Sequence, residues 1–243
     1  MEELAKELYS ACFNENLERV KQLLHPKIDI NWQNNDGRTP FWISCYYGHF
    51  EVVKLLLSDE RVDVNKSDQE KKTPFYVACQ DGCSEIVKLL LSDKRVDVNQ
   101  TDNYGTTPLF ISCQNDRIEV VKLLLNDKRI NVNQGDRNKW TPLWIASSYE
   151  HLEIVKYILA NGRDIDVNAK VQSGYRAIDI AREKQEEEKE SWESDIKYEE
   201  STNYDVIIEL LESFEINPNE TRTRLRLQLG FAGKICIFIS MVN

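Results

Sequence analysis

Cysteine and histidine are the side chains of this sequence best suited to nucleophilic or metal chemistry, and their spacing argues against both. The 243 residues include six cysteines and three histidines, at His25, His49 and His151. Cys79 and Cys83 are four residues apart, but no histidine lies near them in the sequence, so they do not follow a metal-ligand spacing. The nine glycines are scattered and form no phosphate-binding loop.

Carboxylates gather in one segment, residues 186–200, which is rich in glutamate. A general acid and a general base need a dry pocket that separates their pKa values, and a solvated charged segment does not supply one. An enzyme would need a histidine or cysteine that converges with carboxylates in a closed pocket. The sequence therefore predicts a non-enzymatic protein with no catalytic residue, no cofactor and no metal site.

The sequence repeats itself every 34 residues. A Thr-Pro pair recurs at Thr39-Pro40, Thr73-Pro74, Thr107-Pro108 and Thr141-Pro142. A fixed period of this length is typical of a solenoid of stacked repeats. Threonine caps the free N–H groups at a helix start and proline fits the first helical position, so each pair is expected to begin a helix.

Each repeat is expected to hold a second helix. An apolar run such as 41–45 follows the Thr-Pro pair, and Gly48 or Gly82 then ends the first helix in the left-handed region. A wide apolar pattern such as 51–57 predicts the second helix. Neither helix can bury its apolar face within one repeat, so neighbouring repeats must stack.

These residues resemble the ankyrin repeat. The resemblance rests on Thr-Pro followed by Phe or Leu, on Gly-His-Phe-Glu-Val-Val-Lys-Leu-Leu-Leu at 48–57, on Val-Asp-Val-Asn at 62–65 and 96–99, and on Asp-Asn-Tyr-Gly at 102–105. It covers about residues 1–215. It implies an all-α ankyrin-repeat solenoid of about six helix-turn-helix units with projecting loops, plus a C-terminal extension.

One departure from the family is consistent. The family usually has histidine two residues after the Thr-Pro pair, where this sequence has aromatic residues, at Trp42, Tyr76, Phe110 and Trp144. We expect aromatic stacking between repeats to replace the hydrogen bond of that histidine.

Four cysteines occupy the same position of successive repeats, at Cys12, Cys45, Cys79 and Cys113. The family has a small buried residue there, which implies reduced core thiols. Stacked helices lie about 8–10 Å apart, whereas the Cα atoms of a disulfide lie within about 7 Å. Cys83, in a turn, and Cys236, in the tail, lie outside this position and are expected to react fastest with a thiol reagent.

The repeats divide the chain into four parts. We assign residues 1–31 to an N-terminal capping repeat, 32–168 to four ankyrin repeats, and 169–215 to a C-terminal ankyrin-like repeat with an acidic insertion at about 186–203. The insertion has helix formers and no glycine or proline, which favours an extension of the first helix, with a charged loop as the alternative. Residues 216–243 form a basic and then apolar tail.

The tail begins with a helix signal, Asn217 as the cap and Pro218 in the first position. Its letters also alternate from 223 to 229, which leaves a strand open. Three arginines at Arg222, Arg224 and Arg226 form a basic cluster that could dock on the acidic insertion, on a partner or on an anionic surface, the alternative being an ordinary solvated helix. The apolar segment 235–239 is too short to span a membrane.

Recognition is assigned to a surface. In the ankyrin family, partners dock on the projecting loop tips and on the exposed side of the first helices. The side chains at these positions vary between the repeats while the framework residues do not, and Tyr and Trp are enriched among binding hot spots. We therefore expect partner binding by Tyr46, Tyr47, Tyr104, Arg137, Trp140, Tyr149 and Tyr175. Local packing of each aromatic residue against the next loop is the alternative.

The expected function is that of a scaffold or adaptor that binds a segment of a partner protein in the concave groove of the stack. The alternative is a regulatory or substrate-targeting subunit of an enzyme complex, with the tail as the docking element. The formal net charge of −10 disfavours nucleic acid as a partner. The charged start at 1–7 is unlike a secretory signal, and no apolar run reaches the roughly 20 residues of a membrane span. We expect a monomeric cytoplasmic protein, with the nucleus as a second compartment.

Overall fold

The structure is a computed structural model that describes residues 2–191 and 201–231. Within these residues it has thirteen α-helices and no strand, so the predicted all-α class is confirmed. The chain divides into two compact units, residues 1–131 and 132–243.

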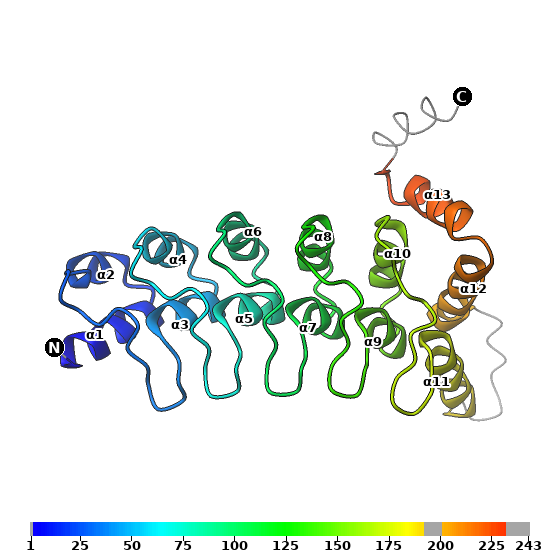
Figure 1. The fold of residues 1–243 in the computed structure, drawn as a ribbon, viewed down its shortest axis with the longest axis horizontal. Helices are drawn as coiled ribbons and strands as arrows, with labels where there is room; N and C mark the ends of the chain where they lie inside the picture. Colours follow the sequence, from blue (N-terminus) through cyan, green and yellow to red (C-terminus); the bar gives the residue numbers. More distant parts are fainter. Residues whose placement is uncertain (1, 192–200, 232–243) are drawn as a thin grey trace. The chain divides into compact units, whose positions relative to one another are not determined.

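The first unit is built from four helix pairs. They are α1 (Glu2–Phe13) with α2 (Leu17–Leu23), α3 (Pro40–Tyr46) with α4 (Phe50–Leu57), α5 (Pro74–Asp81) with α6 (Ser84–Ser92), and α7 (Pro108–Gln114) with α8 (Ile118–Asn126). Within this unit the first helices of the pairs pack in one layer and the second helices in another (Figure 1). The loops that join successive pairs project on the side of the first helices.

The Thr-Pro pairs begin the first helices, as predicted. In each case the threonine hydroxyl accepts the backbone N–H three residues later, at 3.0 Å for Thr39 and Thr73, 3.1 Å for Thr107 and 3.2 Å for Thr141. Proline occupies the first turn of each helix, where its missing N–H costs nothing.

The predicted register of the core is also confirmed. Leu90 of α6 and Leu124 of α8 are fully buried, at 0% exposure. The four cysteines of the shared position are buried in the same layers, and their thiols are free. The apolar face of each second helix is thus covered by its neighbours, as stacking requires.

The aromatic residues that replace the family histidine keep hydrogen bonds to the following repeat in two positions. Trp42 Nε1 donates to the carbonyl oxygen of Lys72 at 2.9 Å. The Tyr76 hydroxyl donates to Asp102 Oδ2 at 3.2 Å. The ring stack of Trp42 is with Tyr46 of its own helix. The expectation of stacking between repeats is therefore wrong at Trp42 and Tyr76, because the indole and the phenol each carry a donor that reaches the next loop.

Arginines close the ends of second helices in the first unit. Arg95 Nη2 donates to the carbonyl oxygen of Leu57, the last residue of α4, at 2.8 Å and to Asp93 Oδ2 at 2.7 Å. Arg129 makes the same contact with the end of α6, where its Nη2 donates to Leu91 at 2.7 Å. The last carbonyls of a helix have no partner within it and carry negative partial charge, so a guanidinium stabilises the helix there.

The second unit holds five helices. They are α9 (Pro142–Ser148), α10 (Leu152–Ala160), α11 (Ala177–Ser191), α12 (Asn203–Ile216) and α13 (Pro218–Gln228). Helix α9 packs against α10 and α11, and α12 packs against the same two helices. Helix α11 continues to Ser191, so the start of the insertion extends the first helix, whereas residues 192–200 lie outside the described residues.

The tail begins as helix α13 and not as a strand. Asn217 Oδ1 accepts the backbone N–H of Glu220 at 3.2 Å, and Pro218 is the first helical residue. The helix packs against α10 and α12. The apolar segment 235–239, with Cys236, lies outside the described residues.

Two of the tail arginines contact the C-terminal end of α10. Arg226 Nε donates to the carbonyl oxygen of Ala160 at 2.8 Å, and its Nη2 donates to that of Asn161 at 3.3 Å. Arg222 Nη2 donates to the carbonyl oxygen of Arg163 at 3.4 Å. This end of α10 is none of the three docking sites expected from the sequence. Arg226 and Arg95 make the same kind of contact, since each donates to the carbonyl oxygen of the last residue of a second helix, α10 and α4 respectively. Helix α13 thus caps the C-terminal end of α10.

The helix-ending glycine is replaced in two repeats. Gly48 and Gly82 have φ of 77° and 80°, and Asp116 and Glu150 adopt the same left-handed conformation with φ of 55° and 62°. A side chain with a Cβ is strained there. Burial, and secondarily the charge of Glu188, also raises the pKa of Glu150.

We expect Glu150→Gly to raise the free energy of unfolding by about 1 kcal/mol at neutral pH, because it removes both the backbone strain and a partly buried charge. Glu150→Gln is the matched control, since it keeps the strain and removes only the charge. A carboxyl whose pKa is raised by folding destabilises the fold once the pH exceeds its unfolded pKa. The gain from Gln is therefore present at pH 7 and absent below about pH 4. Urea melts at both pH values measure these free energies. A Gly variant no more stable than the Gln variant would show that the left-handed conformation of Glu150 does not destabilise the fold.

Candidate protein-binding surface

A side-chain oxygen stabilises the turn at the loop tips that begin with Asn34, Asp68, Asp102 and Asp136. Asp68 Oδ1 accepts the backbone N–H groups of Glu70 and Lys72, both at 2.9 Å. The same pair of bonds recurs at Asn34, Asp102 and Asp136. These turns have a fixed backbone because an Asx side chain substitutes for a backbone acceptor.

Neighbouring tips are joined to each other. In the first unit the N–H of Gln69 donates to the carbonyl oxygen of Asp36 at 3.0 Å, and that of Asn103 donates to Glu70 at 2.9 Å. A Cβ at Gly37 would lie 2.9 Å from the backbone nitrogen of Gln69, so only glycine permits this approach. The tips therefore form a connected edge, and a preorganised surface loses less entropy when it binds.

The first unit carries a contiguous aromatic cluster, defined as Phe13, Trp42, Tyr46 and Tyr47. The ring of Tyr47 packs edge-on against the rings of Phe13 and Tyr46, with 5.1 Å and 5.0 Å between the ring centres. Tyr46 in turn stacks on Trp42, with 5.3 Å between their ring centres. Tyr47 is 49% exposed and Phe13 43%. The structure thus brings two predicted residues, Tyr46 and Tyr47, together with Phe13, which the sequence reasoning missed. Phe13 ends the first helix of its repeat, as Tyr46 does. The alignment of these two positions could have predicted that Phe13 lies on the same surface.

Tyr104 lies at a loop tip of the first unit and is 68% exposed. Its backbone N–H donates to Asp102 Oδ1 at 2.9 Å, which fixes the tip while the side chain projects into solvent. An exposed ring on a fixed backbone is well suited to contact a partner.

The other predicted residues lie in the second unit. Trp140 is half-buried and stacks on Trp144 at 4.9 Å with 11° between the ring planes. Tyr149 is 51% exposed and stacks on His151 at 5.9 Å, and Tyr175 is 43% exposed. Arg137 is exposed at a tip. Trp140 and Tyr149 therefore each have a packing contact of their own, and Tyr149 and Tyr175 remain about half exposed.

The described thiols are poor nucleophiles. Burial raises the pKa of Cys12 to about 12 and raises the pKa values of Cys45 and Cys79 well above the ordinary range. Burial, followed by the charge of Asp81, also raises the pKa of Cys83. The thiolate is the reactive form of cysteine, so these environments oppose nucleophilic chemistry.

Residues 2–191 and 201–231 contain no group of three His, Cys, Asp or Glu side chains arranged to hold a metal ion. In the same two ranges, every helix is too short or too polar to cross a bilayer.

We expect Cys83 to react with a maleimide faster than any other described cysteine, because it is half-buried while the other four are buried. Mass-spectrometric mapping of the labelled sites in native protein measures the rates. Faster labelling of Cys79 or Cys113 than of Cys83 would contradict the core position of those two residues.

Comparison with known proteins identifies the family to which these helix pairs belong. A family model described as ankyrin repeats (3 copies) matches residues 8–102 and 94–170. The chain belongs to the ankyrin-repeat family. The fold is thus the predicted ankyrin-repeat solenoid with a C-terminal extension.

Solved ankyrin-repeat structures resemble the chain over most of its length. The crystal structure of EF0377, an ankyrin repeat protein, is 27% identical, with a TM-score of 0.69, and covers 76% of this chain and 94% of that one. An ankyrin repeat domain from Acinetobacter baumannii AYE, ABAYE2397, has the same TM-score at 20% identity, covers 85% of this chain and 97% of that one, and shows the fold alone. No curated protein matches the sequence.

Ankyrin repeats are general protein–protein interaction modules and are typically non-enzymatic.

Proposed function

We propose that the chain is a non-enzymatic scaffold or adaptor that binds a segment of a partner protein through its loop tips and the ends of its first helices. The observation that carries the proposal is the aromatic cluster of the first unit, in which exposed rings contact one another on a hydrogen-bonded framework. Large apolar side chains that gather on a surface mark interaction sites.

The chemistry of this surface favours a partner segment with apolar and cationic side chains. Tyrosine and tryptophan faces attract a cation by about 0.5–2 kcal/mol, depending on its desolvation. Within the chain, Arg38 makes such a contact with the buried ring of Trp42, where its guanidinium carbon lies 4.8 Å from the ring centre, so the exposed tyrosines are the rings left for a partner. The net charge of −10 would steer such a partner at long range, with an association rate that falls as salt rises.

In the second unit, Tyr149 and Tyr175 supply the equivalent contacts, with Arg137 and Trp140 on the tip. We place the protein in the cytoplasm or the nucleus as a monomer. The free thiols at Cys12, Cys45, Cys79, Cys83 and Cys113 support this placement, because free cysteines are typical of reducing compartments.

Affinity capture from the native cell tests the function. Wild-type protein is compared with Tyr46→Ala/Tyr47→Ala, with Trp140→Ala/Tyr149→Ala, and with Lys88→Ala, whose exposed side chain on α6 makes it the control. We expect one protein to be captured by wild type and by the control and to be lost from at least one aromatic variant. Identical capture by all four proteins would overturn the proposed surface.

A further inference from the structure

Helix α13 is held in place by one of its faces. Thr221 and Leu225 are buried against the rest of the unit. Arg222 and Arg226 on the same side donate to backbone carbonyls at the end of α10. Phe231, just after the helix, meets the ring of Tyr157 edge-on at 5.8 Å. These contacts fix α13, so its opposite face is a rigid surface.

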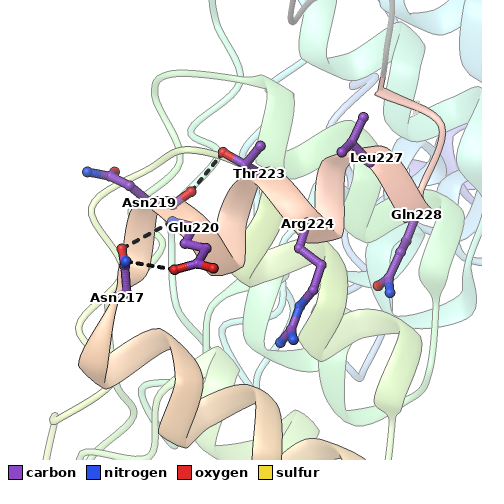
Figure 2. Close-up of a pocket in the computed structure, with 7 residues that line it drawn as sticks. All are labelled: Asn217, Asn219, Glu220, Thr223, Arg224, Leu227 and Gln228. Atoms are coloured by element: carbon purple, nitrogen blue, oxygen red, sulfur yellow. Dashed lines mark hydrogen bonds between the residues drawn. The ribbon is translucent and has the colours of Figure 1, made fainter.

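The opposite face of α13 is hollowed, and most of its exposed lining is carbon, although Leu227 is the one apolar residue among those that line it. The hollow has a volume of about 630 Å³, and its lining residues recur at helical spacing along one side of the helix, at Asn217, Asn219, Glu220, Thr223, Arg224, Leu227 and Gln228. Figure 2 shows these side chains along α13, with Leu227 and Gln228 towards its end. We call this surface the outer groove.

Two apolar side chains of this region lack cover among the described residues. Leu227, in the outer groove, is 59% exposed. Ile216 is 85% exposed and lines an adjoining hollow of about 270 Å³ that shares Asn217, Glu220 and Arg224 with the outer groove. Exposed apolar area next to a concave surface is favourably covered by apolar side chains.

The sequence that follows α13 has the matching chemistry. Residues 235–239, Ile-Cys-Ile-Phe-Ile, are five apolar residues in a row, and the neighbouring Lys234 has the only charged side chain of residues 232–243. The segment begins four residues after Phe231, a span of up to about 14 Å of chain, so it starts within reach of Leu227.

We propose that the outer groove of α13 is the docking site of this chain's own apolar segment 235–239. The segment covers Leu227 and Ile216, and α13 serves as the platform between the end of α10 and the segment.

Cys236 is a reporter inside the docked segment. Its position outside the repeats led us to expect fast reaction with a thiol reagent, and docking reverses that expectation. In native wild-type protein, labelling of Cys236 by N-ethylmaleimide is expected to be at least about tenfold slower than in urea-unfolded protein, after correction for the reagent's intrinsic rate, because a docked segment must open before it reacts.

The test uses the full chain with Leu227→Asp in the groove, Phe238→Asp in the segment and Leu4→Asp as a control. Leu4 is 42% exposed on α1, so its substitution places the same charge on a comparable surface elsewhere. Leu227→Asp and Phe238→Asp are each expected to restore the labelling rate of Cys236 to that of the unfolded chain. Leu4→Asp is expected to leave it at the wild-type value. Melting curves of all three variants are expected to stay close to that of wild type.

Labelling of wild-type Cys236 at the unfolded rate would overturn the proposal, and so would protection that Leu227→Asp leaves intact. The dependence of the labelling rate on protein concentration distinguishes docking within one chain from docking by a second copy. Intramolecular docking gives a labelling rate that does not change on tenfold dilution. Protection that is lost on dilution would assign the groove to a second copy and overturn the proposal for the chain's own segment.

Discussion

Replacing Leu90 by alanine is expected to lower the free energy of unfolding by about 2–5 kcal/mol. Leu90 is fully buried on α6, which packs between α4 and α8 in the first unit. The substitution removes apolar contact and leaves a cavity that the stacked helices cannot fill. Because repeats are coupled mainly to their neighbours, the unfolding transition is also expected to broaden.

Urea denaturation followed by circular dichroism measures this effect. Lys88→Ala on the exposed side of the same helix is the control and is expected to change the unfolding free energy by less than about 0.5 kcal/mol. A Leu90→Ala melt that coincides with that of wild type would show that the repeat register is wrong.

Replacing Arg226 by alanine is expected to lower the free energy of unfolding by about 1.5–3 kcal/mol, the range for hydrogen bonds to a charged group. The variant leaves the carbonyl oxygens of Ala160 and Asn161 without this guanidinium. Gly162→Ala should be destabilising for a related reason. Gly162 has a left-handed φ of 87°, and an added Cβ would collide with the Arg226 guanidinium.

Arg224→Ala is the matched control for Arg226→Ala. Arg224 lies on the same helix, and its ion pair with Glu209 is long, at 4.0 Å, and exposed. Such a pair contributes no more than about 1 kcal/mol. Equal destabilisation by the two alanine variants, measured in the same urea melts, would show that the contact with α10 does not stabilise the second unit.

The repeat framework could be predicted from the sequence because its determinants are local and periodic. Thr39 caps α3 through the residue three positions later, and the same letters return every 34 residues, so one repeat checks the next. The buried positions of Leu90 and Cys79 followed from that alignment alone. The helical start of the tail at Asn217 was equally local.

Contacts between distant or unrepeated parts could not be predicted. The bond from Arg226 to Ala160 joins residues 66 positions apart, and α13 has no second copy in the chain against which it could be aligned. Phe13 joined the aromatic cluster through the ring of Tyr47, which belongs to the next repeat. Trp42 kept a hydrogen bond because its indole N–H reaches Lys72, and that reach depends on three-dimensional geometry that residue type does not reveal.

The structure also separates the partner-binding candidates by their packing. Trp140 stacks on Trp144, so Trp140→Ala is expected to cost stability as well as affinity. Tyr47 and Tyr149 also make ring contacts, but they are about half exposed, at 49% and 51%, so their substitution is expected to cost less stability than that of Trp140.

The most direct test of the proposed surface is the affinity of the captured partner for wild-type protein, Tyr47→Ala, Tyr149→Ala and Lys88→Ala, measured by isothermal titration calorimetry alongside a melting curve of each protein. At least one tyrosine variant is expected to lose about 1–2 kcal/mol of binding free energy, roughly a 5- to 30-fold rise in Kd, with a melting curve close to that of wild type. Lys88→Ala is expected to bind as wild type does. Unchanged Kd values for both tyrosine variants, or melting curves lowered as far as that of Leu90→Ala, would contradict a binding role for these side chains.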